Sequence, residues 1–124
     1  LAFQCNRNTA RELREEILGM LMTDGWSNSV KIAGNTNITI TSVRDKTGLC
    51  LQTGNMARFY ADFLKLQLLY KNGVIDDAVY CVLSKETAVN MGSNLANFDR
   101  VVQELKLFKE IVTVPMYILG MSAE

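Results

Sequence analysis

A short strand, an amphipathic helix and a second buried strand follow one another between residues 49 and 83, and this succession constrains the fold more than any other feature of the chain. Residues 49–53, Leu-Cys-Leu-Gln-Thr, predict a strand, and Gly54-Asn55 leads into a helix over 56–71 with apolar residues at helical spacing. We expect Asn55 to cap that helix and Gly73 to end it. The apolar run 78–83 then predicts a buried strand parallel to the first, because a parallel pair needs a crossover connection.

The region before this unit predicts one helix and two short strands. Asn8 is a plausible N-cap for a helix that Asp24-Gly25 stops. The β-branched runs 30–32 and 38–43 predict strands that form an antiparallel meander with 49–53.

The region after the unit predicts two helices and a closing strand. Ser84 caps a short helix through Met91, Asn97 opens a longer helix, and 112–119 forms the last strand. The main elements follow the order α-β-β-β-α-β-α-β, so we expect an α/β fold with a mixed β-sheet flanked by helices.

The length of the chain predicts a single domain, whereas its net charge excludes few kinds of partner. The 124 residues, 48% of them apolar, suit a single domain over 1–124. A start at Leu1 and an end just after an apolar run suggest a piece of a longer chain that lacks terminal elements. Thirteen basic and thirteen acidic side chains give no net charge, which does not exclude a local basic face on the surface.

No apolar run approaches the roughly 20 residues that span a bilayer, and no signal segment is apparent, so we expect a cytoplasmic protein without a membrane partner.

Histidine and cysteine usage narrows the chemistry. The chain has no histidine, and its three cysteines, Cys5, Cys50 and Cys81, are far apart. This excludes a zinc site of the usual spacing and any triad that needs histidine. Carboxylates, lysines and hard metal ions remain, and the odd cysteine number favours a reducing compartment.

The segment from Gly48 to Leu83 resembles restriction endonucleases of the BamHI and BglII type. The resemblance is carried by Gly-Leu-Cys-Leu-Gln-Thr-Gly-Asn at 48–55 and by the sequence from Lys65 to Asp76, and more weakly by Asn97-Phe98 and 115–120. It implies the restriction-endonuclease-like core of the PD-(D/E)XK nucleases. The implied reaction is Mg²⁺-dependent hydrolysis of a phosphodiester in palindromic double-stranded DNA.

The resemblance also implies an altered active site. It places Cys50 where the family has a metal-binding Glu, Gln52 where BglII-like members also use Gln, and Thr41 where a metal-binding Asp is expected. A thiol and a hydroxyl are poor Mg²⁺ ligands. The nearest carboxylate is Asp45, in a segment with good turn chemistry of its own.

Three interpretations of Cys50 stay open. It is a small buried core residue, or it marks a nuclease site that lost its Glu and still binds DNA, or the metal site has moved to Asp45 with Glu12 or Glu16 of the first helix. Gln52 is either a hydrogen-bonded strand residue or a retained catalytic one. The residues therefore leave enzymatic activity undecided.

The resemblance implies DNA contacts and a two-fold dimer as well. It places Asn55, Ser93 and Asn94 toward the major groove, where Asn can pair with adenine, although capping alone also explains Asn55. Helices 56–71 and 97–110 would form a homodimer that matches a palindromic site. Scattered cations could contact phosphates or simply be solvated: Arg7, Arg11, Arg14, Arg44, Lys46 and Arg58.

We therefore expect a type II restriction-endonuclease-like DNA-binding domain with an impaired active site. The alternative is a catalytically inactive DNA-binding or oligomerisation module of a larger protein.

Overall fold

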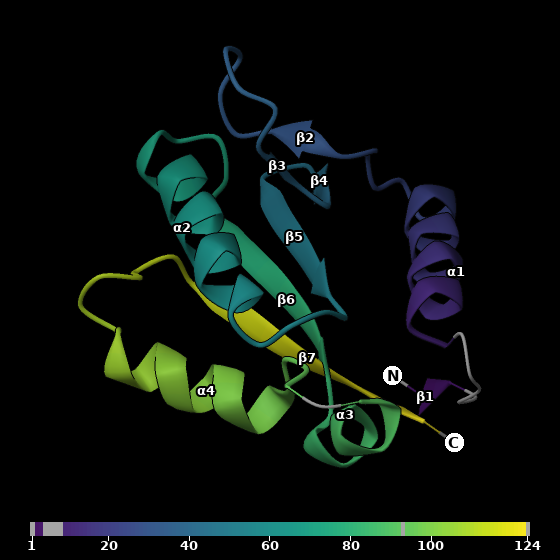
Figure 1. Ribbon diagram of the computed structural model, residues 1–124. Helices are drawn as coiled ribbons and strands as arrows, with labels where there is room; N and C mark the ends of the chain where they lie inside the picture. The colour runs from purple at the N-terminus through teal and green to yellow at the C-terminus, as the bar shows by residue number, and fades with distance from the viewer. Residues whose placement is uncertain (1, 4–8, 93, 124) are drawn as a thin grey trace.

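A five-stranded mixed sheet lies at the centre of the chain, with helices on both faces (Figure 1). The computed structural model describes residues 2–3, 9–92 and 94–123. In chain order the elements are β1 (Ala2–Phe3), α1 (Thr9–Thr23), β2 (Val30–Lys31), β3 (Thr39–Ile40), β4 (Ser42–Arg44), β5 (Thr47–Gln52), α2 (Arg58–Lys71), β6 (Asp77–Leu83), α3 (Lys85–Met91), α4 (Phe98–Leu107) and β7 (Met116–Ala123).

The sheet has the strand order β1-β7-β6-β5-β4, and the predicted parallel crossover is confirmed. Strand β5 pairs with β6 in parallel from Thr47 opposite Asp77 to Gln52 opposite Val82. Strand β7 continues the parallel arrangement on the other side of β6, while β4 runs antiparallel to β5. Residues 48–51 are all buried, as expected for a strand in the middle of a sheet that is covered on both faces.

Two apolar clusters, one on each face of the sheet, hold the layers together. On one face, α2 and α4 pack against the sheet through residues that include Phe59, Phe63 and Val101. On the other face α1 and α3 pack through residues that include Leu13 and Ala88. Because successive strand residues point to opposite faces, Cys50 belongs to the first cluster while Leu49 and Leu51 belong to the second.

The predicted α/β class and its mixed sheet are confirmed, and both antiparallel pairings of the predicted meander are present, but they lie in two separate sheets rather than in one. The run 38–43 breaks at Thr41, so that β3 pairs with β2 in a separate two-stranded sheet and β4 pairs with β5. At the break, the Thr41 hydroxyl accepts a hydrogen bond from the Leu51 backbone N–H at 3.0 Å. Next to it, the buried Ser42 hydroxyl donates to the Ser27 carbonyl at 2.7 Å. These side-chain bonds replace a continuous ladder.

Some helix and strand ends lie where the sequence predicts them, and others do not. Ser84 and Asn97 are the N-caps of α3 and α4, as predicted. Asn55 is not the N-cap of α2, because its side chain accepts from Ala57 N–H in a turn just before the helix. The last strand begins at Met116 rather than at 112, directly after Pro115, which has no N–H for a ladder. The predicted cap Asn8 lies outside the described residues.

Within the ranges that the structure describes, no helix combines the length and the apolar character needed to cross a membrane.

Candidate functional site

A pocket of about 770 Å³ lies between α1 and α2, beside the carboxyl end of β5. Strand β5 and the turn after it contribute residues 50–54, and β3 with the break that follows it contributes residues 39–41. Helix α1 contributes three side chains spaced one helical turn apart, namely Arg14, Leu18 and Met22. Helix α2 contributes four residues, namely Arg58, Ala61, Asp62 and Lys65. The pocket is therefore built from both helical layers and the sheet edge between them.

Three of the predicted catalytic residues meet in this pocket: Thr41, Cys50 and Gln52 all line it. Thr41 lies beside β5 through its bond to Leu51 N–H. Cys50 is only 2% exposed and also belongs to the core under α2. Burial, reinforced by the negative charge of Asp62, raises the pKa of the Cys50 thiol far above its ordinary value. Cys50 is thus a neutral thiol in the wall of the pocket.

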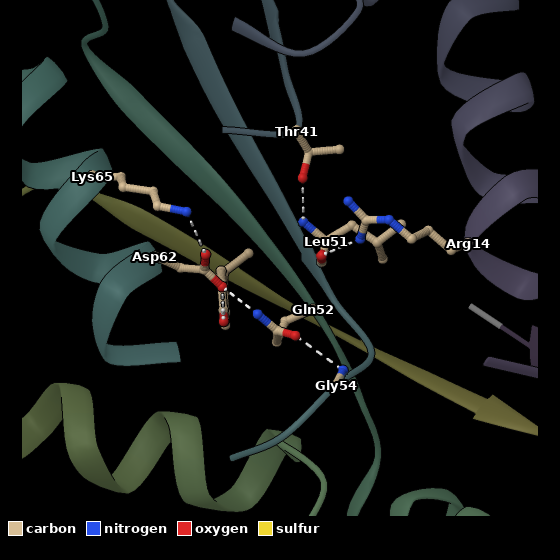
Figure 2. A network of polar contacts seen from close by, with 8 residues as sticks. Arg14, Thr41, Leu51, Gln52, Gly54, Asp62 and Lys65 are labelled. Carbon is tan, nitrogen blue, oxygen red and sulfur yellow. Dashed lines mark hydrogen bonds and ion pairs between the residues drawn. The ribbon is translucent and has the colours of Figure 1, made fainter. Parts of the chain in front are cut away.

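Gln52 is held at both ends of its side-chain amide (Figure 2). Its Nε2 donates to Asp62 Oδ2 at 2.8 Å, and its Oε1 accepts from Gly54 N–H at 2.9 Å. Together these two bonds connect the end of β5 to α2 and to the turn that follows the strand. The orientation of Gln52 is therefore fixed by its neighbours.

Asp62 is the centre of a polar network that the sequence did not single out. The Tyr80 hydroxyl donates to Asp62 Oδ2 at 2.7 Å, and Lys65 Nζ lies 3.7 Å from Oδ1. Burial first, and then the adjacent Asp62 carboxylate, raise the pKa of Tyr80, so this hydroxyl stays a donor. One signal was present in the sequence: Asp62 is three residues after Phe59 and four before Leu66, on the apolar face of α2. A carboxylate at such a position needs buried partners.

The structure does not bring Asp45 and Glu16, the two residues assigned as metal ligands, to the pocket. Asp45 lies exposed in the turn between β4 and β5, at the end of β5 opposite Gln52, with a φ of 53°. Glu16 is exposed on α1, because Leu13 and Ile17 face the core and Arg14 faces the pocket. The alternative partner Glu12 is likewise exposed on α1 and does not line the pocket, so the relocated metal site of Asp45 with either glutamate is not assembled there.

The donor atoms of the pocket do not suit Mg²⁺. This ion requires several hard oxygen ligands, usually with a carboxylate among them. Here Cys50 supplies a protonated thiol, the Thr41 hydroxyl already accepts a hydrogen bond, and both Asp62 oxygens have partners. Across the part of the chain that the structure describes, no three Asp, Glu, Cys or His side chains come together as a metal-binding group.

Cations, in contrast, are well represented around the pocket. Arg14 Nη1 donates to the Leu51 carbonyl at 2.7 Å, between the positions of Cys50 and Gln52 (Figure 2). The Arg58 side chain lies against Gly54, since a Cβ built on that glycine would be 3.6 Å from Arg58 Nη1. With Lys65 these make three cationic side chains against a single carboxylate.

The predicted DNA-contacting segments lie side by side next to the pocket. Met56 N–H donates to the Asn94 carbonyl at 2.6 Å, and Ala96 N–H donates to the Gly54 carbonyl at 2.9 Å. Asn55 and Leu95 form an antiparallel bridge between the two segments. Both Asn55 and Asn94 have exposed side chains, and Asn94 adopts a φ of 58°. Ser93 lies outside the described residues.

The fold and the pocket define a restriction-endonuclease-like protein. The structure is similar to the crystal structure of restriction endonuclease BglII complexed with a DNA 16-mer, with a TM-score of 0.74 and 14% sequence identity. The match covers 97% of this chain and 56% of that one, so this chain spans little more than half the length of that enzyme. Residues 3–121 match the restriction endonuclease BglII/BglIII family, and the chain belongs to that family. No curated protein matches the sequence.

Enzymes of this family typically use a divalent metal ion. The pocket of this chain differs from that expectation, because its side chains do not provide the ligands that such an ion needs.

Proposed function

We propose that this chain is a DNA-binding domain of the BglII type, one domain of a longer protein, whose cleavage of palindromic double-stranded DNA is very slow or absent. The observation that carries the proposal is the pocket itself, where Thr41, Cys50 and Gln52 meet beside β5 without a pair of metal-binding carboxylates. Family membership over residues 3–121 supports DNA as the ligand. The ligand chemistry supports the loss of Mg²⁺-dependent hydrolysis.

The surface formed by Asn55 and Asn94 is the proposed site of base recognition, together with Ser93. Residues 54–56 pair with residues 94–96, so two exposed asparagines come from adjacent backbone segments next to the pocket. An asparagine amide can donate to N7 and accept from N6 of adenine in the major groove. This arrangement favours recognition of a site that contains adenine.

A homodimer is the proposed assembly, through helices α2 and α4. The two helices contact each other where Tyr60 meets Phe108, with ring centroids 6.3 Å apart, and where the Tyr60 hydroxyl donates to Glu104. Around this contact both helices expose apolar side chains, namely Leu64 and Leu68 of α2 and Leu107 and Ile111 at and beyond the end of α4. A two-fold pairing of this surface would present two equivalent recognition surfaces to a palindrome.

A comparison of binding with cleavage tests the proposed function. An electrophoretic shift assay over palindromic duplexes is expected to show binding that weakens as salt rises, because bound cations are released from DNA. The same duplexes incubated with Mg²⁺ are expected to stay intact. Rapid Mg²⁺-dependent cleavage would contradict the proposed loss of activity.

The second candidate function is an oligomerisation module, favoured by the same exposed apolar residues on α2 and α4. A stable dimer that shifts no duplex even at low salt would support this alternative and contradict DNA binding. Under either function we propose a cytoplasmic location, which agrees with the free thiols of Cys50 and Cys81, since disulfides are rare in a reducing compartment.

A further inference from the structure

The pocket beside β5 carries the opposite charge from the one that a metal site needs. A site for a divalent cation collects carboxylates. This pocket has two more positive than negative side chains among those that line it, since Arg14, Arg58 and Lys65 outnumber Asp62. Its one carboxylate is occupied by Gln52, Tyr80 and Lys65. A cavity with an excess of positive charge attracts anions, and its walls strengthen the attraction by excluding water.

Arg14 is the best positioned of these cations. Its bond to the Leu51 carbonyl, 37 residues away in the sequence, fixes the guanidinium beside the strand residues Cys50 and Gln52. That bond uses one of the five N–H donors of the guanidinium and leaves donors for a ligand. An arginine held in this way is well suited to a phosphate group, whose oxygens match two parallel N–H donors.

Lys65 and Arg58 border the pocket from α2, across from Arg14. Lys65 is mostly buried, with 24% of its side chain exposed, and its ammonium group has donors beyond the one facing Asp62. Arg58 is exposed and lies against Gly54, on the side of the pocket where the Asn55 segment begins. The three cations therefore approach the pocket from both of its walls.

We propose that this pocket binds a phosphate group directly through Arg14, Lys65 and Arg58, with the guanidinium of Arg14 taking the place of a divalent metal ion. The inference rests on the proposed function in one respect, since the phosphate is assigned to a DNA backbone. A fixed guanidinium neutralises phosphate charge but does not bind a water molecule as a nucleophile, as a metal ion does. The site is thus one for holding DNA rather than for hydrolysing it.

The first arm of the test measures duplex DNA binding by fluorescence anisotropy, with EDTA and with Mg²⁺. We expect equal affinity in both conditions. Arg14→Gln should weaken binding about tenfold, as for the loss of a hydrogen bond to a charged group, and should reduce the salt slope by about 1. The matched control is Arg11→Gln on the same helix, where the side chain is 88% exposed and pairs only with Glu15 among the described contacts. It should change affinity much less.

The second arm uses inorganic phosphate as the probe and follows the backbone amides of Leu51 and Gln52 by NMR in EDTA. Phosphate should shift these amides in the unmodified chain and not in Arg14→Gln. Because loss of the Arg14 bond to Leu51 could itself disturb the fold, Arg58→Gln serves as a second variant. Arg58 is exposed, and its replacement should weaken both DNA and phosphate binding with the thermal midpoint unchanged.

The two arms separate the possible failures. Phosphate binding in the pocket without any duplex binding would support this site and overturn the DNA-binding function. Equal effects of Arg14→Gln and Arg11→Gln on duplex binding, with no phosphate shift at Leu51 or Gln52, would overturn this site and leave DNA binding intact. A strict requirement for Mg²⁺ in duplex binding would also overturn it.

Discussion

At the scale of single residues, we expect Thr41 and Cys50 to decide whether the pocket can hold a metal ion. The changes Thr41→Asp and Cys50→Glu would place one carboxylate at the break before β4 and one on β5, both lining the pocket with Gln52. We expect the double variant to bind Mg²⁺, which isothermal titration calorimetry would measure, whereas the unmodified chain should show no binding heat. Because Cys50 is buried and near Asp62, the new acids should also lower stability in the absence of metal. No Mg²⁺ binding by a folded double variant would show that the pocket has lost its metal-site geometry.

Asp62 stabilises the fold through three partners. The change Asp62→Ala leaves the Tyr80 hydroxyl, the Gln52 amide and the Lys65 ammonium without their acceptor. We expect a loss of about 2–4 kcal/mol in the free energy of unfolding, measured by urea denaturation with an unchanged m-value. The control Glu16→Ala, at an exposed position of α1, should stay within about 0.5 kcal/mol of the unmodified chain. Equal effects of the two changes would contradict the role given to Asp62.

The two buried thiols predict loss of stability at alkaline pH. Burial raises the pKa of Cys81 from 9.0 to about 11, and the folded chain therefore holds this proton where the unfolded chain releases it. The protonated Cys81 thiol contributes its full stabilisation below pH 9, and this contribution is lost as the pH rises toward 11. The free energy of unfolding then falls by up to about 1.4 kcal/mol per pH unit for each buried thiol of this kind. Denaturation at several pH values should show this decline, and Cys81→Ala should make it less steep. An identical slope in the variant would rule out Cys81 as a source.

At the scale of elements, the contact between β5 and α2 leaves no room at Gly48. A Cβ there would lie 3.0 Å from Ile75 Cδ1 and 3.2 Å from Leu66 Cδ2, both on fully buried side chains. We expect Gly48→Ala to destabilise the chain by about 1–3 kcal/mol through overpacking, measured by thermal or urea unfolding. The control is Gly34→Ala in an open loop, where a Cβ meets nothing within 4 Å. A neutral Gly48→Ala would mean that α2 can move away from the sheet.

The order of the elements was predictable because local apolar periodicity follows directly from burial on a sheet or helix face. The crossover from β5 through α2 to β6 is of this kind. The break at Thr41 was not predictable, since 38–43 is a continuous β-branched run and the break depends on a bond to Leu51 ten residues away. Within the pocket, Thr41, Cys50 and Gln52 were placed together from the family resemblance. The Arg14 bond was missed because its partner Leu51 is 37 residues distant. The network of Asp62 was missed because its buried partner Tyr80 lies on strand β6, 18 residues away.

At the scale of the whole molecule, the exposed apolar surface of α2 and α4 predicts a dimer. Leu64 is 64% exposed and Leu107 is 72% exposed, on the two helices that meet at Tyr60 and Phe108. Sedimentation velocity is expected to show a dimer for the unmodified chain. The double variant Leu64→Asp and Leu107→Asp should be a folded monomer, because buried unpaired charges oppose association. The control Val89→Asp changes an equally exposed residue on α3 and should remain dimeric. A dimeric double variant would place the interface elsewhere.

The hydrogen-bond network around Asp62 couples the shape of this pocket to the stability of the fold. Asp62 joins β5, α2 and β6 through Gln52 and Tyr80, so the same residues that shape the cavity wall also keep the core together. These contacts stabilise the fold whether or not any phosphodiester is cut. Loss of hydrolysis alone would therefore leave the form of this cavity nearly unchanged. A cavity of this kind can take a different ligand without any change in the contacts that maintain its shape.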